Sequence, residues 1–172
     1  MTLLDAGAIR RTLGRMAHEI LEANQGAEGL VVVGILRRGW PMAKRLAFLM
    51  TQIEGTTVPV GKLDVRPYRD DRPKPEGDDT NIPFEVTGKT VILVDEVAHT
   101  GRTVRAALDA LIRHGRPSAV RLAVLVDRGG RELPIQADYV GKTVAPARDE
   151  RVVVRMHEID GEDAVVLENA SS

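Results

Sequence analysis

Two adjacent acidic residues, Asp95 and Glu96, follow a run of four apolar residues in the sequence. The stretch from Val91 to Thr103 reads VILVDEVAHTGRT. An apolar run of this kind predicts a buried strand, and a carboxylate at its end costs free energy unless it binds something. Because carboxylates accept hydrogen bonds from hydroxyl groups, we interpret the pair as a site for a sugar.

The segment from Ala98 to Thr103 has the composition of a phosphate-binding turn. A glycine lets the backbone come close to a ligand, and the first turn of a helix offers amide groups without partners. Two threonines add hydroxyl donors. We therefore predict that a phosphate monoester binds at Ala98, His99, Thr100, Gly101, Arg102 and Thr103. A TGxT segment alone would be an ordinary turn beside solvated acids, but the complete pattern favours a ribose 5-phosphate site.

Two other strand ends carry charged residues. The segment GILRRG, residues 34–39, leaves the first apolar run, and Asp127 and Arg128 follow the run Val120–Val126. In a parallel sheet these ends meet at the edge where ligands bind. A guanidinium such as that of Arg38 can bind two phosphate oxygens at once. Taken alone, these arginines could equally be surface charges, so their assignment depends on the acidic pair and the turn described above.

Three helices are expected from the spacing of apolar residues. The first follows a capping residue, Asp5, and the second has Pro41 in its first turn. The third, Val104–Ile112, stops before Gly115 and Pro117. The predicted buried stripe of the first helix is Ile9, Leu13, Met16, Ala17, Ile20 and Leu21. That of the second helix is Ala43, Leu46, Ala47, Met50 and Ile53.

Short β-branched runs predict the strands. We place them at Gly29–Ile35, Thr57–Val65, Thr90–Val94, Val120–Val126, Asp138–Gly141, Val152–Met156 and Ala164–Leu167. Buried strands that alternate with helices predict an α/β fold, with a mainly parallel, twisted sheet flanked by helices. The segment RPYRDDRPKPEGDDTN, residues 66–81, is too rich in proline, glycine and charge to pack a core. It is either a mobile lid or a surface loop.

The bulk composition narrows the class of protein. A chain of 172 residues can bury one good core, so we expect a single domain. The formal net charge of −1 gives no overall attraction to nucleic acid or membrane, although a basic patch can lie on one face. The absence of cysteine excludes disulfides and fits a cytoplasmic location. No apolar run approaches the roughly 20 residues of a membrane span, so no membrane partner is expected.

The stretch VILVDEVAHTGRT resembles the signature of the type I phosphoribosyltransferases. Nearly the whole chain resembles one family of that superfamily, the PyrR family of pyrimidine-operon attenuation regulators that are also uracil phosphoribosyltransferases. The other matching segments are RRTLGRMAHEI, IEGTTVPVGKLDV, YRDD, GRPSAVRLAVLVDRGGRELPIQADYVGK and EIDGED. The resemblance implies a single type I phosphoribosyltransferase domain over residues 1–172, with a small hood and a flexible loop at about 66–81.

The resemblance implies that a phosphoribosyl group passes from phosphoribosyl pyrophosphate (PRPP) to uracil, which yields UMP and pyrophosphate. Mg²⁺ would arrive with PRPP, without direct protein ligands. The family assigns Asp95, Glu96 and Arg38 to catalysis, and Leu36, Arg37, Arg38 and Gly39 to pyrophosphate, in a turn that often holds a cis peptide. It assigns Arg69, Asp70 and Asp71 to the lid, and Arg128, Tyr139 and Val140 to the base. Tyr139 could equally belong to the core.

Several positions depart from the family pattern. Glu96 replaces the usual second aspartate, and Ala98 and His99 replace a Leu-Tyr pair. Glu96 keeps a carboxylate but moves it by one methylene group, which changes its geometry at the ribose. The loop at residues 66–81 is shorter than is usual in the family, which bears on closure of the lid.

The resemblance also implies binding to a messenger RNA leader and assembly into a homodimer or higher homo-oligomer. The matching RNA-binding residues are Arg10, Arg11, Arg15, His18, Arg131 and Lys142. Gly14 stands where a hydroxyl residue is common, and Gln136 where an arginine is expected. Lost phosphate contacts weaken RNA binding. The chain could therefore be a pure salvage enzyme, with the helix charges only a solvated face. The opposite alternative is an RNA-binding regulator with weak or no transferase activity.

Other enzyme classes fit less well. A purine phosphoribosyltransferase would share the donor site, but the base-side segments resemble the uracil family. Hydrolysis of nucleoside triphosphates is disfavoured because the segments 88–90 and 141–143 lack the upstream glycine of a phosphate-binding loop. Zinc is rejected because His18, His99, His114 and His157 are not spaced as ligands and the chain has no cysteine.

Overall fold

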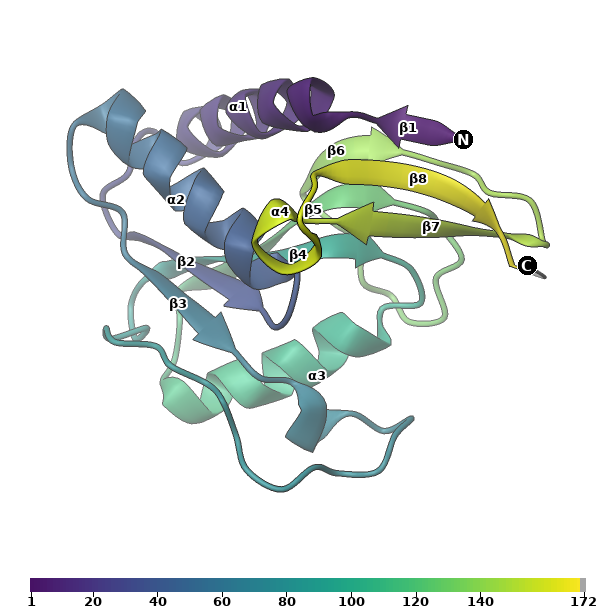
Figure 1. Ribbon diagram of the computed structural model, residues 1–172. Helices are drawn as coiled ribbons and strands as arrows, with labels where there is room; N and C mark the ends of the chain where they lie inside the picture. Colours follow the sequence, from purple (N-terminus) through teal and green to yellow (C-terminus); the bar gives the residue numbers. More distant parts are fainter. Residues whose placement is uncertain (171–172) are drawn as a thin grey trace.

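The computed structural model describes residues 1–170 and contains two β-sheets (Figure 1). The larger sheet has five parallel strands in the order β3-β2-β4-β5-β6. Their bounds are β2 Leu30–Ile35, β3 Val60–Leu63, β4 Thr90–Ala98, β5 Ala119–Asp127 and β6 Tyr139–Thr143. The smaller sheet is antiparallel, in the order β1-β8-β7, with β1 Thr2–Leu4, β7 Glu150–Arg155 and β8 Ala164–Asn169. The predicted α/β class with a mainly parallel sheet is confirmed.

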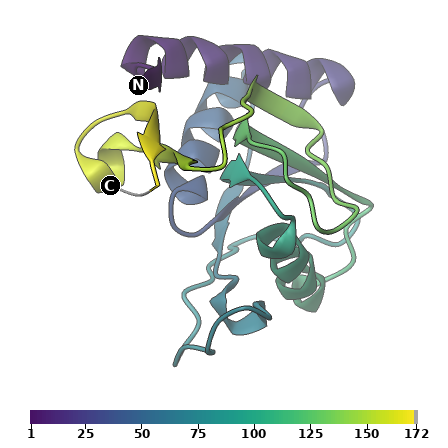
Figure 2. The same ribbon diagram turned by 90° about the vertical axis from the view of Figure 1, so that its right-hand side faces the viewer.

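Helices cover both faces of the parallel sheet (Figures 1 and 2). Helices α1 (Ala6–Ala23) and α2 (Gly39–Glu54) pack on one face, and α3 (Arg102–Leu111) packs on the other. Two hydrophobic clusters fill the layers, one beneath α1 and α2 and one beneath α3. Short 3-10 helices occupy Arg66–Tyr68 (η1) and Ile112–His114 (η2). The sheet is therefore buried on both sides, as its β-branched strands require.

The first helix begins as the sequence predicts. The side chain of Asp5 accepts a hydrogen bond of 2.8 Å from the amide of Ala8, which satisfies one of the free amides at the helix start. All six residues of its predicted stripe are buried. In α2 the stripe is right except for Ile53, whose exposed fraction is 42%. That residue lies in the last turn of the helix.

Strand β4 is longer than predicted. We expected it to end at Val94, but it continues to Ala98, so Asp95 and Glu96 lie within the strand and not after it. Pairing with β5 extends it, since Asp95 stands opposite Val124 and Ala98 stands opposite Asp127. Strand β3 is shorter than its predicted range because only Val60–Leu63 pairs with β2. The sequence did not predict β1 or the short helix α4, His157–Asp160.

The small sheet and α4 form a hood beside the carboxyl ends of β2 and β4 (Figure 1). Ion pairs attach this hood to the main body. Arg45 of α2 binds the carboxylates of Glu158 and Asp163, the latter at 2.8 and 2.9 Å. These ion pairs fasten the hood to α2, the helix that follows β2.

No helix within residues 1–170 has both the length and the apolar character needed to cross a membrane.

Candidate active site

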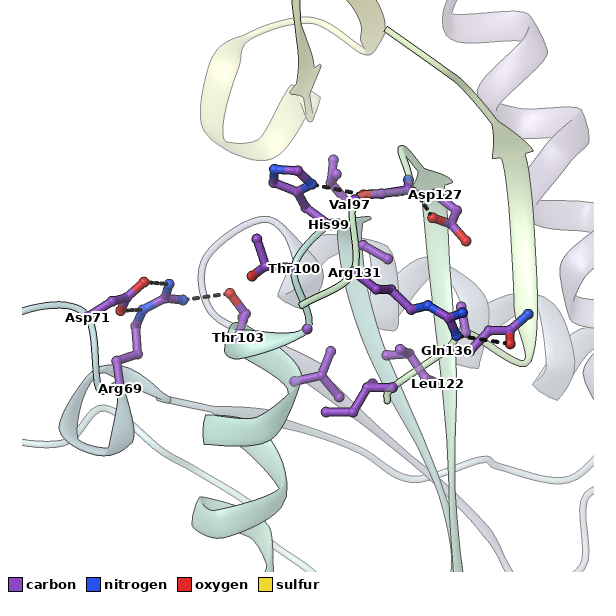
Figure 3. A pocket seen from close by; sticks show the side chains of 17 residues that line it. Arg69, Asp71, Val97, His99, Thr100, Thr103, Leu122, Asp127, Arg131 and Gln136 are labelled. Carbon is purple, nitrogen blue, oxygen red and sulfur yellow. Dashed lines mark hydrogen bonds and ion pairs between the residues drawn. The ribbon is translucent and has the colours of Figure 1, made fainter. Parts of the chain in front are cut away.

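A cavity of about 580 Å³ opens at the carboxyl ends of β4 and β5 (Figure 3). Its lining comes from three parts of the chain, namely the end of β4 with the turn into α3, the segment after β5, and the segment that contains η1. The lining residues are Arg69, Asp71, Val97, Ala98, His99, Thr100, Gly101, Thr103, Val104, Leu122, Asp127, Gly129, Gly130, Arg131, Ile135, Gln136 and Ala137. The predicted phosphate-binding turn thus shares one cavity with Asp127 and the segment that follows β5.

The turn from β4 into α3 is held in place by the segment after β5. Gly101 has φ +96°, a left-handed conformation that favours glycine. A Cβ atom on Gly101 would lie 3.4 Å from Cβ of Leu133, so the turn packs directly on that segment. The carbonyl of Thr100 accepts hydrogen bonds from the amides of Glu132 and Leu133, at 2.9 and 3.2 Å. These contacts fix the amide-rich end of α3 toward the cavity.

Five of the six residues predicted to bind phosphate line the cavity. Arg102 is the exception, because its guanidinium turns outward and forms ion pairs with Asp70 at 3.0 Å and Glu132 at 2.9 Å. The side chain of His99 lies on the Asp127 side of the cavity, apart from Thr103 (Figure 3). Its Nδ1 is 2.9 Å from the carbonyl oxygen of Gly129. The backbone of His99 therefore belongs to the turn, while its imidazole belongs to the opposite wall.

The two adjacent acids differ in environment. Asp95 has an exposed fraction of 5%, whereas Glu96 is half-buried. Burial, and next the negative charge of Glu96, raise the pKa of Asp95 well above its ordinary value. Neighbouring residues of a strand point to opposite faces, and the charges nearest to the two acids differ accordingly. Asp95 interacts with Arg69, and Glu96 interacts with Arg38. Neither Asp95 nor Glu96 is among the described residues that line the cavity of about 580 Å³.

The turn after β2 packs tightly against β4. The peptide bond between Leu36 and Arg37 is cis, as the resemblance led us to expect. A Cβ atom on Gly39 would lie 2.4 Å from the carbonyl oxygen of Val94, so glycine is required for this approach. The turn is thereby brought against the residue that precedes Asp95.

The two arginines of this turn point to different surroundings. Arg38 makes a two-pronged pair with Asp160 of the hood, with Nε to Oδ2 at 3.1 Å and Nη2 to Oδ1 at 2.7 Å. Hydrogen bonding to Asp160 raises the pKa of Arg38, and Arg38 in turn lowers the pKa of Asp160. Arg37 is exposed and lines a smaller cavity of about 240 Å³. The remaining lining of that cavity is Leu36, Lys62, Asp64, Arg66 and Asp79.

The segment at residues 66–81 contacts the phosphate-binding turn. Arg69 binds both carboxylate oxygens of Asp71, at 2.8 and 2.7 Å, and donates a hydrogen bond of 2.5 Å to the hydroxyl of Thr103. Buried Asp64 fastens the start and the end of this segment, through Arg66 and the amide of Asp79. Hydrogen bonding to Arg66 lowers the pKa of Asp64 to about 2. The predicted lid residues Arg69 and Asp71 thus reach the cavity.

None of the three predicted base-binding residues, Arg128, Tyr139 and Val140, is among the residues that line the cavity. The exposed fraction of Tyr139 is 8%, its ring belongs to the core beneath α1, and its hydroxyl accepts a hydrogen bond of 3.2 Å from Asn24. The expected contact of Tyr139 with a base is therefore not supported, and the alternative of core packing is correct. Val140 is half-buried, and its carbonyl receives a weak contact from Arg15 at 3.4 Å.

Other residues form this wall. Ile135, Gln136 and Ala137 line the cavity, and the sequence reasoning had given none of them a base-binding role. Their position, in the connection that returns the chain from the edge of β5 to β6, is the signal that could have found them. Arg128 stands in sequence between Asp127 and Gly129, which both line the cavity, and its Nε is a buried nitrogen without a hydrogen-bond partner within residues 1–170. An unpaired buried donor of this kind is costly and marks a place where a ligand can bind.

The basic residues predicted to bind RNA fall into two groups. Arg10, Arg11 and His18 are exposed along α1. Arg15 instead pairs with Glu19 and donates a hydrogen bond of 2.6 Å to the carbonyl of Gly141, which brings exposed Lys142 of β6 beside α1. Arg131 lines the cavity and contacts Gln136 at 3.3 Å.

Comparison with known proteins agrees with this geometry. The sequence profile of the phosphoribosyl transferase domain matches residues 2–157. The bifunctional protein PyrR of Pelotomaculum thermopropionicum is 57% identical over 169 residues, which cover 96% of this chain and 93% of the relative. The bifunctional protein PyrR of Thermus aquaticus is 56% identical with the same coverage.

Solved structures of purine enzymes share the fold. The hypoxanthine phosphoribosyltransferase of Trypanosoma cruzi superposes with a TM-score of 0.75 at 19% identity, and covers 98% of this chain and 96% of that chain. The hypoxanthine phosphoribosyltransferase of Staphylococcus aureus gives a TM-score of 0.72 at 22% identity, with 96% and 90% coverage. Together with the sequence match and the cavity, these likenesses show that the chain belongs to the PyrR family within the type I phosphoribosyltransferase superfamily.

Proposed function

We propose that this protein transfers the phosphoribosyl group of PRPP to uracil, with UMP and pyrophosphate as products. The observation that carries the proposal is the cavity of about 580 Å³, in which the amide-rich turn at the start of α3 faces the wall formed after β5. Such a cavity can hold a phosphate at one end and a base at the other. A single phosphoribosyltransferase domain, residues 1–172, is the proposed functional unit.

The 5-phosphate of the donor would bind at residues 98–103, where backbone amides and the hydroxyls of Thr100 and Thr103 converge. The contact of Arg69 with Thr103 supports a lid role for Arg69, Asp70 and Asp71. The hydroxyl of Thr103 accepts a hydrogen bond from Arg69 here, and it could donate one to a bound phosphate instead. Closure of this segment would exclude water from an activated sugar.

Pyrophosphate would bind at the turn from Leu36 to Gly39, with Arg38 as its two-pronged partner. The ribose hydroxyls would bind Asp95 and Glu96, because these acids lie between the turn after β2 and the start of α3. Burial of Asp95 beside Glu96 supports this role, since a hydroxyl donor would add to the hydrogen bond of 2.9 Å that its Oδ1 accepts from the amide of Glu96 and would lower the cost of a buried carboxylate.

Mg²⁺ fits this arrangement as an ion bound through the donor. Within residues 1–170 no three His, Asp or Glu side chains converge as a metal site. Mg²⁺ keeps several waters and commonly binds through substrate phosphates, so it needs few protein ligands. The bound ion would neutralise charge on the leaving pyrophosphate. The chain itself would orient the donor and stabilise the positive charge that develops on the sugar, through the carboxylates of Asp95 and Glu96.

Uracil would bind at the wall after β5. The unpaired Nε of Arg128 and the backbone of residues 135–137 offer polar groups for the base edge, and we retain Val140 as a neighbouring candidate. A purine enzyme is the second candidate for this site, since the solved structures named above act on hypoxanthine. The identity of 57% to a PyrR protein favours uracil.

The second proposed function is binding of a messenger RNA leader in response to UMP. The relatives are named bifunctional, and α1 presents Arg10, Arg11 and His18 to solvent next to Lys142. Arg131 would couple the two functions, because it lines the nucleotide cavity. We further propose a cytoplasmic location and assembly into a homodimer or higher homo-oligomer, as the resemblance to the PyrR family implies.

Release of pyrophosphate from PRPP tests the proposal. The purified protein should release pyrophosphate when uracil and Mg²⁺ are both present, and the release should stop when either is left out. Hypoxanthine and guanine serve as control bases. Release that depends on hypoxanthine but not on uracil would establish the purine alternative, and no release with any base would leave the RNA-binding function alone.

A further inference from the structure

His99 is held in a defined orientation at the junction of the two cavity walls. Its Nδ1 is 2.9 Å from the carbonyl oxygen of Gly129. A carbonyl oxygen only accepts hydrogen bonds, so Nδ1 must carry a proton. In the neutral imidazole the other nitrogen, Nε2, then has a free lone pair. The hydrogen bond thus makes Nε2 the proton-accepting atom.

The imidazole ring of His99 packs directly against the backbone of Gly130. Gly130 has φ +80°, and a Cβ atom there would lie 2.8 Å from Cε1 and 3.0 Å from Nδ1 of His99. Any other residue would push the ring out of its place. The imidazole is therefore positioned by the backbone of two consecutive glycines, Gly129 and Gly130, beside the wall that we assign to the base.

The other titratable side chains that line the cavity are less suited to accept a proton. Asp71 is bound at both oxygens by Arg69, and one oxygen of Asp127 accepts a hydrogen bond of 2.9 Å from the amide of Gly129. Arginine stays protonated, which excludes Arg69 and Arg131. His99 directly follows β4, and the charged side chains that line the same cavity are Arg69 and Asp71 from the segment after η1, and Asp127 and Arg131 from the end of β5 and the segment after it. Imidazole is the side chain that changes charge near neutral pH.

We propose that His99 is a catalytic residue whose Nε2 accepts the proton from N1 of uracil during transfer. This inference rests on the proposed function. The N1–C1 bond forms while the bond from C1 to the pyrophosphate oxygen breaks, and its electron pair leaves with pyrophosphate. The proton of N1 passes to Nε2, which makes His99 an imidazolium, and later returns to solvent. In the reverse direction the imidazolium protonates the departing base.

The test is a comparison of pH profiles for wild type, His99→Gln and the matched control His114→Gln, an exposed histidine at the end of η2. A positioned general base contributes about 10²–10⁴-fold, so His99→Gln should lower kcat by about 10²-fold or more. Wild type and His114→Gln should share one dependence of kcat on pH, and His99→Gln should show a different, flatter one. The KM for PRPP and the affinity for UMP should stay within about twofold, and UMP affinity also verifies the fold.

A second variant, His99→Ala, leaves room for a free imidazole molecule. Added imidazole should raise the kcat of this variant and leave wild type unchanged. The inference is wrong if His99→Gln keeps the wild-type kcat, or if it raises the KM for PRPP at unchanged kcat, which would make His99 a phosphate contact. These results are distinct from failure of the proposed function, in which wild type itself releases no pyrophosphate with uracil.

Discussion

Arg38 and Asp160 are 122 residues apart in sequence and form a two-pronged ion pair, with Nη2 of Arg38 2.7 Å from Oδ1 of Asp160. The pair joins the turn after β2 to the hood, and Asp160 also accepts a hydrogen bond of 2.8 Å from the amide of Met156. An asparagine at position 160 can keep only part of these hydrogen bonds with Arg38 and Met156. We expect Asp160→Asn to lower kcat/KM for PRPP by about tenfold, because Arg38 loses its fixed orientation. Glu162→Gln, which removes only an exposed hood pair with Arg155, is the control. Equal kcat/KM in the two variants would contradict the role of Asp160.

The acidic pair of β4 should be indispensable for transfer. The double variant Asp95→Asn with Glu96→Gln keeps the shape of both side chains and removes their charge. We expect kcat to fall by about 10³-fold or more, since the developing positive charge on the sugar loses its stabilisation. Circular dichroism and the urea midpoint should stay close to wild type, because burial of Asp95 already disfavours its charged form. Retained turnover in this variant would refute the assignment of the ribose site.

Tyr139 provides a direct comparison between core packing and base binding. Because its ring lies beneath α1 and its hydroxyl bonds to Asn24, Tyr139→Phe should lower the free energy of unfolding by about 1 kcal/mol. The KM for uracil should change by less than about twofold. Urea unfolding and steady-state kinetics measure the two effects. A large rise in the KM for uracil at unchanged stability would restore the base-binding role.

Asp64 should make stability depend on acid pH. Its pKa is lowered from 3.8 to about 2 in the folded protein, so it stabilises the fold above pH 3.8 and this contribution is lost as the pH falls toward 2. Asp64→Asn should cost about 1–2 kcal/mol at pH 7, with allowance for the exposure of its partner Arg66. The difference from wild type should shrink between pH 4 and pH 2. A difference that stays constant over this range, measured by urea unfolding, would argue against the ion pair as its cause.

Gly14 allows a test of RNA binding. A Cβ atom at this position would meet nothing within 4 Å among the described residues, so Gly14→Thr is tolerated by the fold. The added hydroxyl should strengthen binding to a leader RNA severalfold in the presence of UMP, whereas Arg11→Gln should weaken it and reduce its salt dependence. Filter binding at several salt concentrations measures both effects. Equal, salt-independent binding by all three proteins would contradict an RNA role for α1.

The sequence predicts those features that local spacing determines. The stripe from Ile9 to Leu21 and the run Val91–Val94 depend only on near neighbours, and both appear as predicted. The turn at residues 98–103 is also local, since glycine and the start of a helix suffice to expose amides. Strand β1, Thr2–Leu4, is too short to show alternation and exists because it pairs with β8 at the far end of the chain.

Residues whose place depends on tertiary contacts could not be predicted. The side of the sheet on which Tyr139 lies follows from the register of β6 against β5, where Tyr139 stands opposite Ala123. A shift of one residue would have turned this ring to the other face. The ion-pair partners of Arg38 and Arg102 likewise come from distant segments. Neither the pair with Asp160 nor that with Glu132 can be predicted from the neighbouring sequence. Only the folded structure shows that Ile135, Gln136 and Ala137 face the cavity.

A crystal structure of the protein with UMP tests the central claim most directly. The phosphate should lie within hydrogen-bond distance of the amides of residues 99–103, the ribose hydroxyls should contact Asp95 and Glu96, and the uracil ring should lie against residues 135–137. UMP bound at another place, with the turn at the start of α3 unoccupied, would contradict the account.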